Sequence, residues 1–148
     1  MSEALSPNAS AAAVQTRFGS FAANPEDVVC FPSGLPGFER CRQFVLIGAE
    51  EIAPFRCLHG LDAPRPSFLV VEPTLAFARY RRVLGQADRL RLDVQADDTL
   101  LWLAVVSIGP DGAMVNLRAP LVVNPRNMLG CQVMPRRSLY PLAHPLGA

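Results

Sequence analysis

The chain has 148 residues, 50% of them hydrophobic, and its 14 basic and 13 acidic side chains leave a formal net charge of +1. A chain of this length usually forms one domain with one core, and so small a net charge argues against direct nucleic-acid binding. The longest uninterrupted apolar run spans residues 100–106, far short of the ~20 residues of a membrane-spanning helix, so we expect no membrane segment.

Residues 1–16 are small and polar and show no periodicity that would bury one face, so we expect a flexible tail that ends before Arg17. Over residues 17–148 we expect a single all-β domain, because short runs rich in β-branched, aromatic and leucine residues alternate with Pro and Gly. The predicted strands span residues 17–22, 27–31, 43–47, 55–60, 67–72, 99–108, 114–117, 121–124 and 130–134.

Three of these strands contain continuous apolar runs, which predicts that protein covers both of their faces. We therefore place the following residues at the centre of the core: Phe68, Val70, Leu101, Leu103, Val105 and Val122. The residues between two later strands, 109–112, include one Pro and two Gly and predict a hairpin turn.

The proline-free stretch 74–109 begins with apolar residues at three- and four-residue steps, as on one face of a helix. Gly85 would weaken a helix that ran through it by ~1 kcal/mol relative to Ala. We therefore expect a helix only over about 86–92, and a strand over 78–84.

The four cysteines are Cys30, Cys41, Cys57 and Cys131, and they form no C-x-x-C pair. The histidines are also far apart, so the sequence predicts no zinc site, no cofactor and no metal. A chain of this size can form a sufficient hydrophobic core without disulfide bonds. We therefore expect free thiols in a reducing cytoplasm.

No catalytic signature of the common hydrolase, metalloprotease or nucleotide-binding types is present, which favours a protein that is not an enzyme. Cys57 and His59 could act as nucleophile and base, but residues two apart in a strand merely share a face. The alternative is therefore a small ligand-binding barrel or enzyme with a pocket near Cys57, His59 and Trp102.

The loop Phe31-Pro-Ser-Gly-Leu-Pro-Gly-Phe-Glu39 places apolar groups where polar residues are usual. Its glycines allow positive φ and its prolines stiffen it. We predict a partner-binding surface that includes Gly34, Leu35, Pro36, Gly37 and Phe38. Leu35 is the predicted contact with the partner, and Phe38 is predicted to hold the loop on the core.

A second candidate segment, Asn116-Leu-Arg-Ala-Pro-Leu-Val-Val-Asn124, contains a proline between two strands and so predicts a bend. We expect Asn116 to satisfy backbone groups at this bend. Its residues Asn116, Leu117, Arg118 and Pro120 are further candidates for partner binding. The pairs Arg81–Arg82 and Arg136–Arg137 could bind an acidic partner or RNA, although neighbours in a strand point to opposite faces.

Several segments together resemble the FliW family of flagellar assembly factors, from about residue 16 to residue 146. The similar segments are Arg17-Phe-Gly19, the loop 31–39, Pro54-Phe55, Glu72-Pro73, Tyr80, the segment 116–124, Gly130, Gln132-Val133, Tyr140 and His144-Pro-Leu146. The chain departs from the family at His59-Gly60 and in its Ala-rich leader.

The resemblance implies a β-rich, partly closed antiparallel barrel with one or two short helices. It also implies two protein partners, flagellin and the carbon storage regulator CsrA, an RNA-binding repressor of flagellin translation. In that scheme the protein inhibits CsrA when cytoplasmic flagellin is depleted, and flagellin sequesters the protein when secretion stalls.

Overall fold

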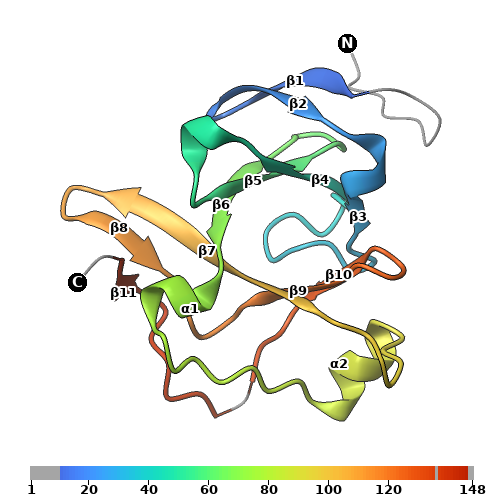
Figure 1. The fold of residues 1–148 in the computed structure, drawn as a ribbon, viewed down its shortest axis with the longest axis vertical. Coiled ribbons are helices and arrows are strands. Elements are labelled where there is room, and N and C mark those ends of the chain that lie inside the picture. The colour runs from blue at the N-terminus through green and yellow to red at the C-terminus, as the bar shows by residue number, and fades with distance from the viewer. Residues whose placement is uncertain (1–10, 136, 147–148) are drawn as a thin grey trace. The chain divides into compact units, whose positions relative to one another are not determined.

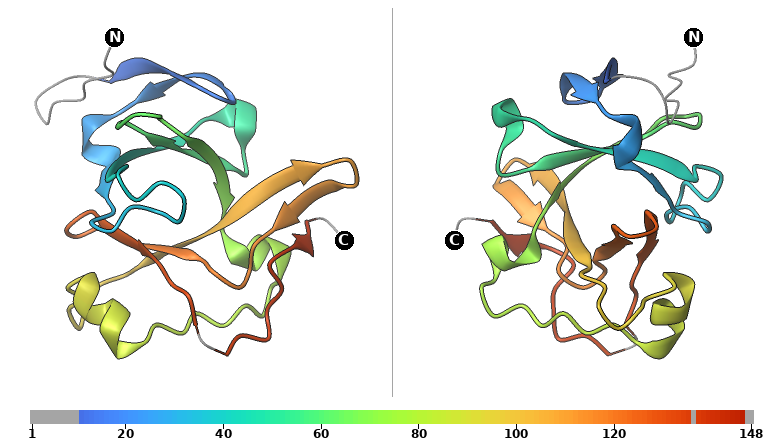
Figure 2. Two further views of the ribbon diagram at one scale, coloured as in Figure 1. Left: turned by 180° about the vertical axis from the view of Figure 1, so that it is seen from behind. Right: turned by 45° about the vertical axis from the view of Figure 1, so that its right-hand side comes forward.

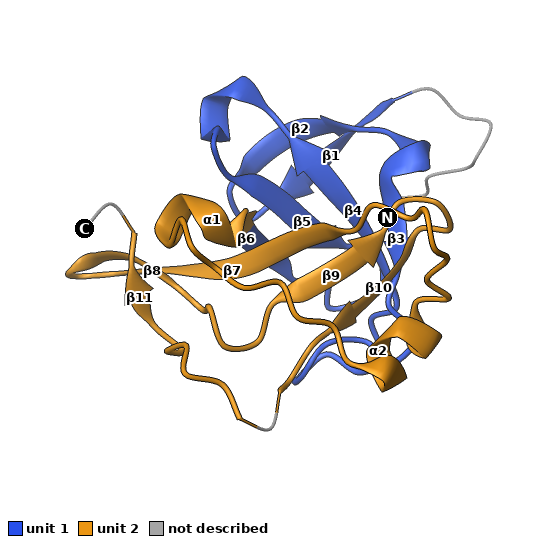
Figure 3. Ribbon diagram, turned by 60° about the horizontal axis from the view of Figure 1, so that its bottom comes forward, with its two compact units in different colours: residues 1–69 blue, residues 70–148 orange. Residues whose placement is uncertain are grey.

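The computed structural model describes residues 11–135 and 137–146, and it divides into two compact units, residues 1–69 and 70–148 (Figure 3). Strands dominate both units (Figure 1). Unit 1 contains β1 (Ala12–Thr16), β2 (Gly19–Ala23), β3 (Val28–Cys30), β4 (Gln43–Gly48), β5 (Arg56–Gly60) and the first residues of β6 (Ser67–Val71). Unit 2 contains the end of β6, then α1 (Pro73–Ala76), α2 (Gln86–Arg91), β7 (Leu101–Gly109), β8 (Gly112–Val115), β9 (Leu121–Asn124), β10 (Leu129–Gln132) and β11 (His144–Pro145).

The first two strands of unit 1 correct the predicted start of the ordered chain. β1 pairs antiparallel with β2, and Val14 lies opposite Phe21. Val14 is only 3% exposed and belongs to a core cluster with Phe21 and Ile47. One buried valine among small residues has no periodicity, which is why the sequence predicted a tail here. The rest of that predicted tail, residues 1–10, lies outside the described residues.

Three further strands of unit 1 pair antiparallel in the order β3–β4–β5. β4 lies in the middle, with Val45 opposite Val28 on one side and opposite His59 on the other. Phe44 and Val45 are fully buried, as expected for an apolar run in a central strand.

Unit 2 contains a five-stranded antiparallel sheet in the order β11–β8–β7–β9–β10. The long strand β7 pairs with β9 through its first residues and with β8 through its last. The predicted hairpin is confirmed, because Gly109 faces Gly112 across the turn and Gly112 has a φ of 105°.

The predicted helix over 86–92 is confirmed as α2, but the predicted strand over 78–84 is wrong. Residues 77–85 form no helix or strand (Figure 2). The backbone N–H of Arg81 donates to the Tyr140 hydroxyl at 2.8 Å, a side-chain acceptor in place of a neighbouring strand. The one-turn helix α1, which was not predicted, begins at Pro73, where a missing N–H costs nothing.

The predicted core residues divide into two groups. Val70, Leu103 and Val122 are at most 1% exposed, while Phe68, Leu101 and Val105 are half-buried. The nine strands predicted outside residues 78–84 are all present, with ends that differ by one to two residues in most cases. The predicted class, all-β with one or two short helices, is confirmed.

Candidate protein-binding site

Unit 2 carries a groove of about 830 Å³ whose lining is mainly apolar. Two coil segments, residues 77–85 and 137–143, contribute most of the lining, and they lie beside each other in both views of Figure 2. The apolar lining residues are Phe77, Tyr80, Val83, Trp102, Leu117, Pro120, Val133, Pro135, Leu139, Tyr140 and Pro141. Val83 is 65% exposed and Leu139 is fully exposed, so apolar surface faces solvent here. Exposed apolar surface of this kind commonly marks an interaction site.

Tyr80 ties the first coil segment to the bend after β8. Its hydroxyl donates to the Leu117 carbonyl at 2.8 Å, and its ring is only 9% exposed. Burial, with a smaller contribution from Tyr140, raises the pKa of Tyr80 to about 12. The hydroxyl therefore remains a hydrogen-bond donor throughout the physiological pH range.

Tyr140 ties the second coil segment to the first. Its ring lies 4.6 Å from the Tyr80 ring, and its hydroxyl accepts the Arg81 N–H. Its carbonyl accepts a hydrogen bond from Nε of Arg118 at 2.9 Å, and the next carbonyl, of Pro141, accepts from the N–H of Leu117 at 3.1 Å. These bonds hold three chain segments together around the groove.

Four arginines line the groove: Arg79, Arg81, Arg118 and Arg137. Asp88 is the one acidic residue among the described lining residues, and Arg91 already neutralises it at 3.0 Å. The groove therefore combines apolar walls with an excess of positive charge.

The predicted segment 116–120 contributes to this groove through Leu117, Arg118 and Pro120. Leu117 and Pro120 are buried, so Arg118 presents the most accessible side chain of the three. Oδ1 of Asn116 accepts the backbone N–H groups of Arg118 and Ala119, both at 3.1 Å. This confirms that Asn116 satisfies the backbone at the bend.

In the predicted loop of unit 1, Leu35 differs from its predicted place at the surface, whereas Phe38 packs against another aromatic ring. Leu35 is only 5% exposed, so it is not the surface contact that the sequence suggested. Phe38 is half-buried and packs edge to face on Phe68 at 5.6 Å. Among the predicted contacts 34–38, the exposed residues are Pro36 and Gly37.

The burial of Leu35 follows from the tight turn over residues 35–38. The N–H of Phe38 donates to the Leu35 carbonyl at 2.7 Å, and Gly37 has a φ of 84°. Pro followed by Gly with positive φ is the pattern of a type II turn. This turn puts Pro36 and Gly37 at its tip and leaves Leu35 at its base, against the core.

Cys57 and His59, two residues of the alternative pocket, are both buried. Cys57 is 0% exposed and His59 is 2% exposed, and Nδ1 of His59 lies 2.8 Å from the Ser67 hydroxyl. Burial raises the pKa of the Cys57 thiol, which opposes its use as a nucleophile. Trp102, the third residue of that hypothesis, lines the groove of unit 2.

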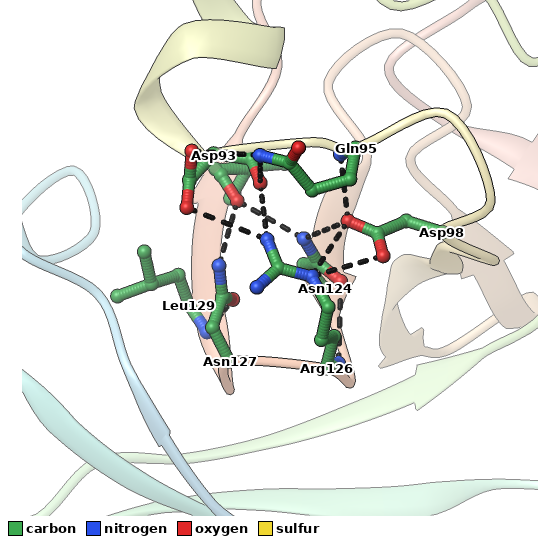
Figure 4. Close-up of polar contacts among 8 residues, drawn as sticks. Asp93, Gln95, Asp98, Asn124, Arg126, Asn127 and Leu129 are labelled. Atoms are coloured by element: carbon green, nitrogen blue, oxygen red, sulfur yellow. Dashed lines mark hydrogen bonds and ion pairs between the residues drawn. The ribbon is translucent and has the colours of Figure 1, made fainter.

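A polar cluster fixes the segment after α2 to the turn between β9 and β10 (Figure 4). The side-chain amide of buried Asn124 donates to the Leu92 carbonyl and to Asp98, both at 3.0 Å. Arg126 reaches the same carboxylate at 3.0 Å. The N–H of Gln95, then Asn124 and Arg126, hold the pKa of Asp98 below its usual range. The polar groups of this cluster form hydrogen bonds with one another, which indicates a structural role.

Comparison with known proteins gives this chain its family. Residues 12–146 match the profile described as FliW protein. A flagellar assembly factor FliW from Syntrophotalea carbinolica is 34% identical over 136 residues, which cover 91% of this chain and 97% of that protein. The chain belongs to the FliW family. A second FliW, from Bacillus subtilis, is 31% identical over 137 residues, 90% of this chain and 96% of that protein.

A crystal structure of the flagellar assembly factor FliW also matches this chain, with a TM-score of 0.82 at 28% identity. The match covers 93% of this chain and 98% of that chain. The family resemblance predicted from the motifs is therefore confirmed, and the fold is that of a FliW protein. The chain is a flagellar assembly factor of this family.

Within this FliW fold, the sequence motifs did not indicate that residues 77–85 and 137–143 share a groove. The signals available in the sequence were apolar residues near arginines, namely Phe77 and Val83 in the first segment and Leu139 in the second. Arg81 lines the groove while its neighbour Arg82 lines a smaller hollow, so that pair forms no single patch. Arg136, of the other predicted pair, lies outside the described residues.

The described residues also bear on membrane-spanning and metal-binding sites. No helix among them is long and apolar enough to cross a membrane. In the same part of the chain, no three His, Cys, Asp or Glu residues come together as a group that could hold a metal ion.

Proposed function

We propose that this FliW-family protein works in the cytoplasm by binding flagellin and by antagonising CsrA through direct protein–protein contact, without catalysing a reaction. The observation that carries the proposal is the preformed apolar groove of unit 2, in a chain that belongs to a family of flagellar assembly factors. A groove that needs no rearrangement avoids much of the entropic cost of binding a partner.

The accessible parts of the two predicted segments are the proposed contacts. Arg118 lies at the groove, and Pro36 and Gly37 form the tip of the loop in unit 1, next to the half-buried Phe38. Arg118 also donates to the Tyr140 carbonyl, so its guanidinium is held in place before a partner arrives. Arginine fixed in this way is a common energetic anchor of protein interfaces.

Isothermal titration of the purified protein with flagellin and with CsrA, each at two salt concentrations, tests the proposal. We expect both to bind, and the variant Arg118→Ala to weaken at least one of them by about 2 kcal/mol, as for an interface hot spot. Arg17→Ala is the matched control, because Arg17 is exposed in unit 1 and belongs to neither segment. Absence of binding to both proteins would reject the proposed function.

A further inference from the structure

The charged and apolar side chains that line the groove of unit 2 limit the kinds of ligand that it can bind. Its four arginines give the groove an excess of positive charge, although the net charge of the whole chain is only +1. None of Arg79, Arg81 and Arg137 forms an ion pair with any of the described residues. Exposed apolar side chains line the same groove, with Val83 on one coil segment and Leu139 on the other.

We propose that this groove binds a short acidic, amphipathic segment of a protein partner, in which apolar side chains alternate with Asp or Glu. The apolar side chains would cover Val83, Leu139 and Trp102, and the carboxylates would pair with Arg79, Arg81 and Arg137. The inference rests on the proposed function in one respect, namely that the chain acts by binding proteins.

The mixed lining favours a peptide segment over a nucleic acid. Binding to a phosphate backbone draws most of its affinity from charge and needs a basic surface, whereas the lining here is mainly apolar. A peptide with both kinds of side chain buries the apolar walls and places carboxylates opposite the arginines. Arginine binds carboxylates in a planar, two-point geometry, which adds selectivity for Asp and Glu.

The groove is also stiff enough to select among sequences. Its two coil segments are joined by the stacked rings of Tyr80 and Tyr140 and by the bonds of both residues to neighbouring backbone. Preorganised walls present apolar and charged groups at fixed positions, so binding depends on the spacing of the partner's side chains.

Selection from a displayed library of random 12-residue peptides tests this inference on the full chain. We expect enriched peptides to contain apolar residues together with Asp or Glu. A synthetic copy of an enriched peptide is then titrated by fluorescence anisotropy. The double variant Arg79→Glu, Arg137→Glu should weaken its binding at least tenfold, and Arg17→Glu, Arg42→Glu, with the same net charge, should not.

A second pair of variants tests the apolar walls. Val83→Gln with Leu139→Gln should weaken the same peptide at least tenfold. Leu90→Gln with Leu142→Gln should leave its affinity unchanged, because both leucines are more than half exposed but do not line the groove. Thermal melts of all four double variants show whether each is folded.

Three results would overturn the inference: no enriched peptide, enrichment of basic peptides, or peptide binding that both groove variants retain. Displacement of the peptide by a 12-nucleotide single-stranded RNA at lower concentration than by free peptide would assign the groove to RNA instead. The proposed function fails separately, if flagellin and CsrA do not bind the wild-type protein in the titrations above while acidic peptides do.

Discussion

At the scale of single residues, Gly34 shows how tightly the backbone of the loop 31–39 packs against itself. Its φ is 63°, a left-handed conformation that costs other residues about 1–2 kcal/mol. A Cβ at this position would lie 2.6 Å from the Phe38 carbonyl oxygen and 2.6 Å from the Glu39 Cα. Both are backbone atoms and cannot move aside without opening the turn that buries Leu35.

We therefore expect Gly34→Ala to lower the free energy of unfolding by at least about 2 kcal/mol, from the strained φ and the clash together. Gly48→Ala is the matched control, since a Cβ at position 48 would meet nothing within 4 Å and the φ of Gly48 is not in the left-handed range. Urea unfolding curves of the two variants give the comparison. Equal stability of Gly34→Ala and the wild type would contradict the geometry of this turn.

At the scale of elements, apolar runs long enough to form a buried strand were predictable from sequence, and short elements were not. Seven consecutive apolar residues lie just before and within β7. The Gly-Pro-Asp-Gly sequence at its end predicts a turn by itself. β1 has one buried valine, and α1 has a single turn. Their formation depends on packing against residues elsewhere in the chain, which no local pattern contains.

The groove was unpredictable for a related reason. Tyr80 and Tyr140 are 60 positions apart, and their rings stack only because the fold brings two irregular segments together. The segment 116–120 was found because its proline marks a bend, and the bend happens to lie at the groove. Leu35 was assigned to the surface because a loop rich in Pro and Gly usually is exposed, whereas this turn directs its first residue inward.

The segment 92–98 gives a prediction about pH, because Asp98 links it to β9. Its lowered pKa means that ionised Asp98 stabilises the fold above the unfolded-state pKa of about 4. This contribution is lost as the pH falls through the lower folded-state value. We expect Asp98→Asn to have a lower Tm than the wild type at pH 7, and the difference to shrink towards pH 2.

Thermal melts across that pH range, with Asp97→Asn as the matched control, test the role of Asp98. Asp97 is exposed and none of the hydrogen bonds or ion pairs among the described residues involves its side chain. The control should follow the wild type at every pH. A constant Tm difference for Asp98→Asn between pH 7 and pH 2 would show that ionisation of Asp98 does not stabilise the fold.

At the scale of the whole molecule, the distribution of charge matters more than its sum. The net charge of +1 made a basic binding surface look improbable, yet four of the 14 basic residues line one groove. The net charge is a sum over the whole surface, whereas a partner contacts only one part of that surface. The two arginine pairs visible in the sequence were a poor guide to this groove, because Arg79 and Arg118, which also line it, belong to neither.

The four thiols give a prediction for the whole chain. All are free in the structure; Cys30 is partly exposed, whereas Cys41, Cys57 and Cys131 are at most 3% exposed. Burial raises the pKa of each of these three thiols, that of Cys131 to about 11. The thiolate is the reactive form, so both access and ionisation disfavour their reaction at neutral pH.

We therefore expect iodoacetamide to label Cys30 first in the native protein at pH 7.5, with the other three thiols labelled only as fast as the fold opens. Timed quenching followed by peptide mass spectrometry measures the four rates, and the Cys30→Ser variant should lose the fast phase. Urea-unfolded protein provides the control, because all four thiols should then react at similar rates. Fast native labelling of Cys57 would mean that its core opens readily, and would restore the Cys57–His59 pair as a candidate for chemistry.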